Sequence, residues 1–302
     1  MLTRAYEGEA AWLEARRGGV GGSDASALFR DENGNSLNPF KSEYELWAEK
    51  LGLLERSFAE SEAMYWGKAL EPVIAQRYEQ ATGRMLMDHG RWTIFRSPKH
   101  GHMYCTPDRE IIGDPRGPGL LSIKNVSQWK AGEWEHEAPP YYQIQLQHEM
   151  AVVEGITWGS FAVLIGGNRF VWFDVERNDA FIQALVERVN EFMQLIETKQ
   201  APAVDGSKRT AEALKRLYAE ETGEVITLAD GYVEIAEDFE EIKAELRRLE
   251  KRKLLRENQL REGIGAASIA RLPAGGGYSL KSVHRKGHVT EATTYRELRR
   301  IK

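Results

Sequence analysis

The stretch that decides the fold is residues 105–126, CTPDREIIGDPRGPGLLSIKNV. Apolar residues gather on both sides of a segment rich in glycine and proline, a pattern typical of two strands joined by a hairpin. The first strand is expected over residues 102–112 and the second over 119–126. Because strand residues two positions apart point to the same face, Ser122 and Lys124 are expected to face one site beside Asp108.

Helices and further strands are predicted around this hairpin from hydrophobic periodicity, caps and glycine breaks. The order of helix, three strands, helix, two strands and helix indicates an α/β (α+β) fold, with a mixed central sheet flanked by helices. The expected helices are 24–29 with Ser23 as its N-cap, 41–51, 60–82 ending at Gly83, 141–155 and 178–199, and the other strands are 91–97, 158–167 and 169–175.

A domain boundary is expected in QAPAVDGSKRT, residues 200–210. Residues 1–205 would form one domain with a helical N-terminal segment, 1–58, and residues 206–302 a helical extension ending in a hairpin and a basic tail. Over 233–254 a heptad seam recurs with spacing 4, 3, 4, 3. A surface helix packed on its own domain is favoured over a free coiled coil, which needs three or four heptads. The seam residues are Ile235, Phe239, Ile242, Leu246 and Leu249.

Composition excludes several classes of protein. The chain has 302 residues, 42% of them hydrophobic, and a net charge of −5, which argues against a protein that simply coats nucleic acid. No apolar run approaches the roughly 20 residues that span a bilayer, and the N-terminus has no apolar signal core. Cys105 is the single cysteine, so no internal disulfide forms. We therefore expect a cytoplasmic protein without membrane contact.

Three short motifs carry candidate chemistry. GKALEP, residues 67–72, places Glu71 on a helix, TPD places Asp108 in or beside a strand, and SIK places Lys124 on the next strand. Carboxylates hold Mg²⁺, which takes oxygen ligands and keeps several waters. The metal activates a water, and a lysine orients that water or stabilises developing charge. This grouping is what phosphodiester hydrolysis requires.

The chain resembles the lambda-exonuclease-like (YqaJ) viral recombinases, a branch of the PD-(D/E)xK nucleases. The resemblance covers roughly residues 10–205 and rests on WLEARRGGVGGSDASAL (12–28), GKALEP, TPD, SIK and YYQIQLQHEM (141–150). It implies a restriction-endonuclease-like core. It further implies catalytic roles for Lys124, Asp108, Glu71, Gln143 and Gln147, metal binding by Asp108, Ser122, the Ile123 carbonyl and Glu71, and binding of a 5′-phosphate by Arg16 and Ser23.

One position departs from the family pattern, because the family's glutamate two residues before the lysine is Ser122 here. A neutral hydroxyl binds Mg²⁺ more weakly than a carboxylate. Glu110, two residues from Asp108, is one candidate replacement. Alternatively, Ser122 ligates directly or through water, or the site is degenerate and the protein binds DNA ends without cutting them.

The resemblance implies an exonuclease dependent on Mg²⁺, with Mn²⁺ able to substitute, that acts 5′→3′ on double-stranded DNA ends for phage-type recombination. It also implies a ring-shaped homotrimer, a single-strand annealing protein as partner, and a phage- or prophage-encoded protein in a bacterial host. A different hypothesis is an assembly protein that uses the 233–254 helix. Trp129 and Trp134, in the loop 128–140, are candidates for stacking on DNA, with a packed loop as the favoured alternative.

Overall fold

The computed structural model describes residues 2–55 and 61–284. The chain forms two compact units, Met1–Ala219 and Glu220–Lys302. The predicted basic tail, residues 296–302, lies outside the described residues.

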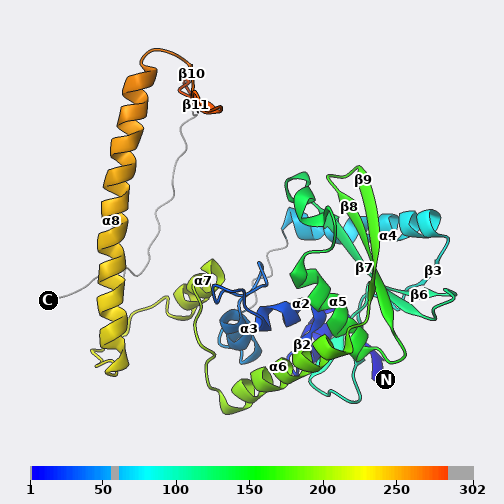
Figure 1. Ribbon diagram of the computed structural model, residues 1–302. Helices are drawn as coiled ribbons and strands as arrows, with labels where there is room; N and C mark the ends of the chain where they lie inside the picture. The colour runs from blue at the N-terminus through cyan, green and yellow to red at the C-terminus, as the bar shows by residue number, and fades with distance from the viewer. Residues whose placement is uncertain (1, 56–60, 285–302) are drawn as a thin grey trace. The chain divides into compact units, whose positions relative to one another are not determined.

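A five-stranded mixed sheet is the centre of the first unit (Figure 1). β7 and β8 are parallel, and every other neighbouring pair is antiparallel, which confirms the predicted mixed sheet. A parallel pair needs a crossover, and this one consists of η2 (Gln128–Trp134) and α5 (Pro140–Val152). The strands, in spatial order, are β3 (Met85–Met87), β6 (Arg109–Ile112), β7 (Gly119–Val126), β8 (Trp158–Ile165) and β9 (Arg169–Glu176).

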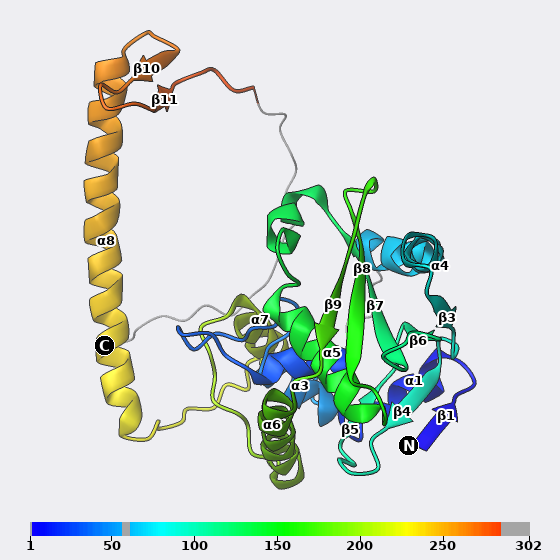
Figure 2. The same cartoon turned by 45° about the vertical axis from the view of Figure 1, so that its right-hand side comes forward.

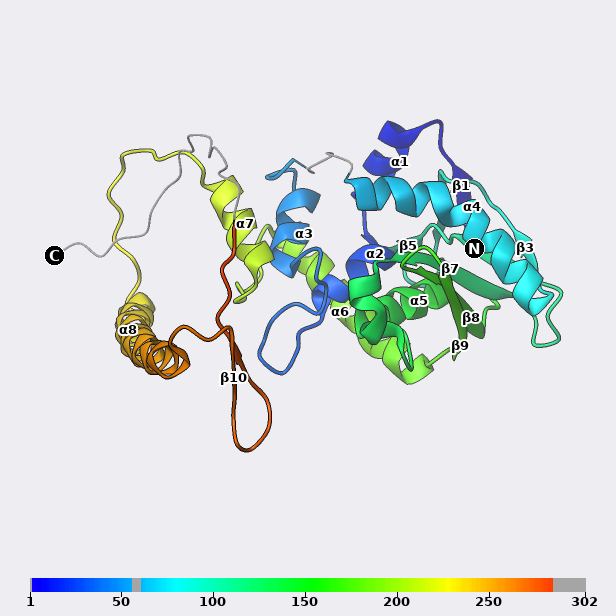
Figure 3. The ribbon, with the colours of Figure 1, turned by 90° about the horizontal axis from the view of Figure 1, so that it is seen from above.

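Helices cover both faces of this sheet, with α4 (Glu62–Thr82) on one side and α5 on the other (Figure 3). Successive side chains of β7 point to opposite faces of the sheet, so the strand contributes residues to the hydrophobic cluster on each face. Leu121 packs in the α4 cluster, while Leu120 packs in the larger cluster with residues of α5 and α6 (Asp179–Thr198). The end of β7 is thereby held between two buried layers.

A second, four-stranded sheet lies beside α1 (Glu9–Ala15) and was not predicted (Figure 2). The expected strand over 102–112 was wrong, because it is two strands in different sheets, β5 and β6. Pro107 has no N–H to donate, and the chain leaves one sheet at Cys105 before entering the other at Arg109. The second sheet has the order β1 (Leu2–Ala5), β4 (Thr93–Arg96), β5 (Met103–Cys105) and β2 (Val20–Gly21).

The predicted helix over 24–29 begins and ends earlier than expected, and only its first part is α-helical. It consists of α2 (Gly22–Ala25) followed by the 3-10 turn η1 (Ser26–Leu28), and its N-cap is Gly21 rather than Ser23. α3 (Glu43–Lys50) matches the predicted 41–51 helix, and Ser42 caps it by accepting from the Glu45 N–H.

The first unit extends past the boundary predicted at residue 205. α7 (Lys208–Leu217), which the sequence assigned to the extension, buries Ala213 in the larger core cluster. Arg216 also forms an ion pair with Glu45 of α3 at 3.4 Å. Both contacts tie α7 to the N-terminal helices, which moves the division to residues 219 and 220.

The second unit contains one long helix and a hairpin. α8 (Gly231–Ile264) extends beyond the predicted 233–254 at both ends. The predicted hairpin is confirmed as β10 (Ile269–Arg271) paired antiparallel with β11 (Gly277–Ser279). In the described part of the chain, no helix combines the length and the hydropathy that crossing a bilayer demands.

We predict that Gly119→Ala destabilises the fold by about 1–3 kcal/mol, because overpacking a core displaces its neighbours. A Cβ at this position would lie 2.6 Å from the Trp158 ring, which is fully buried. Urea denaturation measures the change. Gly67→Ala in α4 is the control, since no described atom would meet its Cβ within 4 Å, and it should stabilise by about 0.5–1 kcal/mol. Equal stability of the Gly119→Ala variant and wild type would contradict this packing.

Candidate functional site

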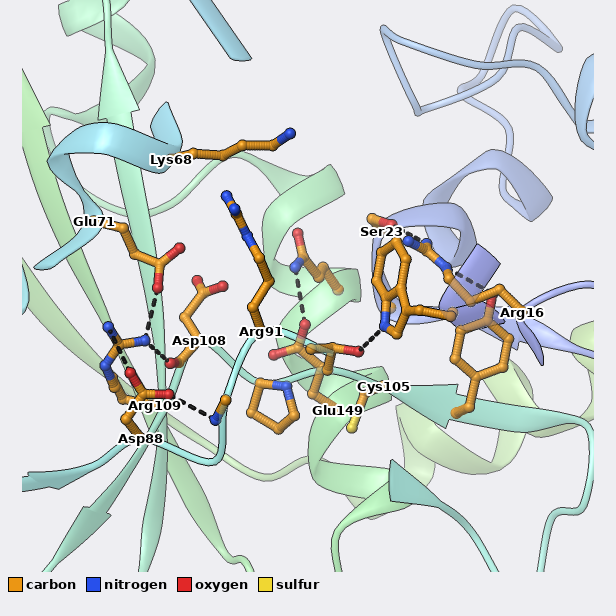
Figure 4. A pocket seen from close by; sticks show the side chains of 18 of the residues that line it. Arg16, Ser23, Lys68, Glu71, Asp88, Arg91, Cys105, Asp108, Arg109 and Glu149 are labelled. Carbon is orange, nitrogen blue, oxygen red and sulfur yellow. Dashed lines mark hydrogen bonds and ion pairs between the residues drawn. The ribbon is translucent and has the colours of Figure 1, made fainter. Parts of the chain in front are cut away.

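The candidate site is a pocket beside the point where β6 begins and β7 extends past it (Figure 4). Asp108 immediately precedes β6, and its Oδ2 accepts the Ile123 N–H of β7 at 2.7 Å. The β6–β7 register ends at Arg109 opposite Leu121. Because the N–H and C=O of a strand residue point to the same edge, the Ile123 carbonyl lies on the edge that faces Asp108. A carboxylate and a backbone oxygen therefore meet at this edge.

α4 brings Glu71 to the same pocket from one face of the sheet. Its Oε1 is 2.6 Å from the Arg109 guanidinium, which also contacts Asp88 at 3.2 Å. Burial and the nearby Asp108 raise the pKa of Glu71, although Arg109 opposes the shift. Glu71 and Asp108 both line the pocket, one from α4 and the other from the start of β6.

α5 supplies a third carboxylate, Glu149, which the sequence analysis missed. Its side chain is only 3% exposed and lines the pocket with Asp108 and Glu71. Burial raises the pKa of Glu149 to about 7, and the negative charge of Asp108 adds to the shift, while Lys124 partly offsets it. A buried, perturbed acid beside other acids is typical of functional sites.

Lys124 reaches this group through α5. Its Nζ donates to Gln145 Oε1 at 3.3 Å, and Gln145 Nε2 in turn donates to Glu149 Oε1 at 2.8 Å. The ammonium group also lies 4.8 Å from the centre of the Tyr142 ring. Strand β7 and helix α5 are thus joined by a polar chain that ends on the buried acid.

Two predicted replacements for the family's strand glutamate do not reach the pocket. Ser122 is 1% exposed, and no described residue hydrogen-bonds its hydroxyl. Glu110 instead contacts His89 Nε2 at 2.7 Å. Neither side chain lines the pocket, whereas Glu149 does.

Gln143 and Gln147, for which the family resemblance implies catalytic roles, do not line the pocket. Gln147 is buried, donates to the Glu176 carbonyl at 2.8 Å and accepts from the Asn178 N–H at 2.9 Å. Gln143 donates to the Ala138 carbonyl at 2.7 Å. These contacts hold α5 to its neighbours rather than lining a site.

Arg16 and Ser23 do meet, at the opposite side of the same pocket (Figure 4). Arg16 Nη2 donates to Ser23 Oγ at 3.3 Å, and the guanidinium lies 4.3 Å from the Trp12 ring centre. Burial disfavours the charge of Arg16, but Tyr104 and Asp24 raise its pKa above the ordinary value. A cation and a hydroxyl held together in this way suit a phosphate group.

Gly22 lets the α2 segment approach the acids closely. A Cβ at this position would lie 2.9 Å from Glu149 Oε1, so a larger residue would push α2 away from α5. The glycine therefore explains how Ser23 and Glu149 come to line one pocket.

The two tryptophans of the loop 128–140 differ in solvent exposure. Trp134 is 1% exposed and stacks on Phe173, as the favoured packed loop predicts, so it is not available to stack on DNA. Trp129 is 96% exposed and remains a candidate for that role.

The donor set suits a hard divalent cation, although the described residues hold no cluster of three or more His, Cys, Asp or Glu arranged to bind a metal as they stand. Asp108, Glu149 and the Ile123 carbonyl are oxygen donors, and Mg²⁺ needs only one or two carboxylates because it keeps its waters. One observation favours such an ion: burial and the charge of Asp108 both disfavour the ionised form of Glu149, which a bound cation would stabilise. Glu71 forms an ion pair with Arg109, which competes with direct binding of a metal by its carboxylate.

Comparison with known proteins shows the family. Residues 11–157 match the model of the YqaJ-like viral recombinase domain. The uncharacterized protein YqaJ of Bacillus subtilis (strain 168) is 35% identical over 254 residues, which are 83% of this chain and 76% of that protein. The chain therefore belongs to the YqaJ-like viral recombinase family.

Solved structures share the fold. The alkaline exonuclease LHK-Exo from Laribacter hongkongensis superimposes with a TM-score of 0.52 at 24% identity, over 63% of this chain and 94% of that chain. Its complex with dAMP gives the same TM-score at 25% identity and the same coverage. The fold predicted from the sequence, a restriction-endonuclease-like core, is confirmed by this likeness.

We predict that Glu149→Gln stabilises the metal-free protein at about pH 8 by a few kcal/mol and has little effect at about pH 5. The folded pKa, about 7, lies above the unfolded one, so the acid's contribution to stability is present at low pH and lost as pH rises through about 7. The amide removes that loss and keeps an oxygen for the Gln145 bond. Thermal unfolding at both pH values measures this. An equal change at both would contradict the burial of a charged Glu149.

Proposed function

We propose that this protein is a DNA exonuclease that hydrolyses phosphodiester bonds at double-stranded ends. The observation that carries the proposal is the pocket shared by four carboxylates, three of them Asp108, Glu149 and Glu71, and by the Arg16–Ser23 pair, in a member of a viral recombinase family. Acids on one side suit metal-assisted hydrolysis, and a cation with a hydroxyl on the other suits a terminal phosphate. The alkaline exonuclease of the same fold supports the reaction class.

The proposed cofactor is Mg²⁺, with Mn²⁺ able to substitute. Asp108, Glu149 and the Ile123 carbonyl would hold it, and Glu71 would act through water. When bound, such an ion activates a water and offsets charge on the pentavalent phosphorus. Glu149 then supplies from α5 the acid that β7 lacks at Ser122.

Lys124 has the role of the positively charged group beside the reacting phosphate. Its contact with Gln145 holds the ammonium near Glu149, and no carboxylate among the described residues forms an ion pair with it, so the charge stays available to substrate. There it orients the attacking water or stabilises the charge that develops on phosphate oxygens. Burial of Glu149 and Tyr142 around it lowers the local dielectric and strengthens that effect.

The proposed polarity is 5′→3′, because Arg16 and Ser23 would hold a 5′-phosphate while the acids act on the adjoining bond. Arg16 is fixed by Tyr104, whose hydroxyl accepts from its Nε at 3.2 Å, and by the Trp12 ring. A rigid guanidinium loses less freedom when it binds phosphate. A ring-shaped trimer and a single-strand annealing partner belong to the same proposal through family resemblance.

We predict that Asp108→Asn and Glu149→Gln each abolish detectable cleavage and weaken Mn²⁺ binding by roughly ten- to a hundredfold or more, since even groups that only orient metal ligands contribute that much. Calorimetric titration with Mn²⁺ supplies a readout independent of catalysis, alongside digestion of a 5′-phosphorylated duplex. Glu110→Gln is the matched control, because Glu110 faces His89, and it should retain both properties.

Ser122→Glu tests whether the acid has changed elements. Combined with Glu149→Gln, it should recover part of the lost Mn²⁺ affinity, since it restores a carboxylate on the face of Lys124. Wild-type cleavage by Glu149→Gln would exclude Glu149 as the replacement ligand. Folded wild-type protein that binds duplex ends but cuts in neither metal would instead identify a DNA-end-binding protein.

We predict that Arg16→Ala slows digestion of 5′-phosphorylated ends about ten- to a hundredfold more than that of 5′-hydroxyl ends. A charge-assisted contact is worth about 1.5–3 kcal/mol, and only the phosphorylated end makes it. Initial rates on the two duplexes measure the ratio. Arg17→Ala is the control, because Arg17 is exposed and pairs with Glu14. Equal slowing on both ends would reduce Arg16 to a general phosphate contact.

A further inference from the structure

α8 has an apolar stripe that stays exposed in the described part of its own unit. The helix has 34 residues, about 50 Å at 1.5 Å per residue, and within the described chain none of them is buried. The described residues of this unit, 220–284, do not bury it in the way that the sequence favoured. The stripe has five members, Ile235 (61% exposed), Phe239 (44%), Ile242 (48%), Leu246 (53%) and Leu249 (43%).

The same heptad spacing continues past Leu249 but changes character. The next seam positions are Lys253 and Arg256, followed by Leu260. The seam therefore has an apolar residue near each end of the helix, Ile235 at one and Leu260 at the other. The two cations that occupy seam positions, Lys253 and Arg256, both lie in the second half of the helix. A partner must place something other than another cation opposite Lys253 and Arg256.

Charge divides α8 into two halves. Residues 234–245 contain six acids and one base, and residues 247–256 contain six bases and one acid. The helix macrodipole favours acids in the first turn and bases in the last, but its effect falls off within those turns. The basic run lies in the middle of the helix, so the dipole does not account for it. Complementary halves instead suit a partner of opposite charge order.

We propose that α8 binds the α8 of a second copy of this chain, antiparallel and over its full length. The midpoint of the helix lies between Arg247 and Arg248, and a two-fold axis there sets each acidic half against a basic half. Seam and flanking residues then pair well. The pairs, each formed twice, are Leu246 with Leu249, Ile235 with Leu260, Ile242 with Lys253, Phe239 with Arg256, Glu245 with Arg252, and Lys243 with Glu250.

The antiparallel direction follows from comparing the residue pairs that form in a parallel and in an antiparallel arrangement of the two helices. A parallel dimer would set Lys253 against its own copy in the seam, and Arg256 likewise. It would also place Glu245 beside Glu250 of the other helix. In the antiparallel pair these cations lie over Ile242 and Phe239, where their apolar stems pack while their charged ends reach the acidic half.

The seam is tested by the mass of the full chain in solution, measured by light scattering. Leu246→Glu with Leu249→Glu should halve the wild-type mass, because a two-fold pair does not fit inside a cyclic trimer and therefore joins two otherwise separate assemblies. Leu254→Glu with Leu255→Glu is the matched control, since these exposed leucines lie outside the seam, and it should leave the mass unchanged. An equal mass for wild type and the seam variant, with α8 helical by circular dichroism, would overturn the proposal and indicate that α8 binds its own chain or another partner.

Glu245→Arg separates the two directions. In the antiparallel pair it faces Arg252 and should weaken self-association at least tenfold, and adding Arg252→Glu should restore it. In a parallel pair it would face Glu250 and strengthen association. Sedimentation at several concentrations gives the dissociation constants. Tighter association of the single variant would overturn the antiparallel arrangement, and self-association seen only when duplex DNA is added would identify the basic half as a DNA contact instead.

Discussion

One hydrogen bond fixes the geometry on which the site depends, from the Ile123 N–H to Asp108 Oδ2. It forms where the backbone pairing of β6 and β7 has ended, so a side-chain oxygen replaces the next carbonyl of the ladder. Pro107, which has no N–H to donate, precedes it at the crossing between the two sheets. The acid is therefore held by the sheet edge instead of by a loop, and α4 and α5 can deliver Glu71 and Glu149 to it from opposite faces.

Much of the fold could be predicted because the burial of one face of a helix or strand produces a periodic spacing of apolar residues in the sequence. The alternating β7, the α4 helix with its Gly83 end, and the β8–β9 hairpin are all visible as local patterns. The division of 102–112 between two sheets was not visible, because both strands look alike locally and only their partners differ. The same holds for α7, whose attachment depends on long-range contacts with α3.

The site was predictable where a motif names one residue, as for Asp108, Glu71 and Arg16, and not where a helix presents several candidates. On α5, three alternate glutamines precede Glu149, and sequence alone does not state how the helix is rotated. Gln145 and Glu149 are four apart and share the face toward the pocket, whereas Gln143 and Gln147 face elsewhere. Unless the orientation of α5 is known, the sequence does not show that Glu149, near the end of the motif, faces the site.

Because the acid is on α5 and not on β7, different contacts determine its position. A carboxylate on β7 would be positioned by the ladder that holds Lys124, whereas Glu149 is positioned by how α5 packs on the sheet. Leu146, fully buried on α5, contacts the sheet where a Cβ on Gly159 would meet it at 2.9 Å. Close packing resists small shifts, so the core itself sets the distance between the acid and Asp108. Core substitutions along this interface should therefore alter metal affinity as well as stability, a coupling that a strand-borne acid would largely avoid.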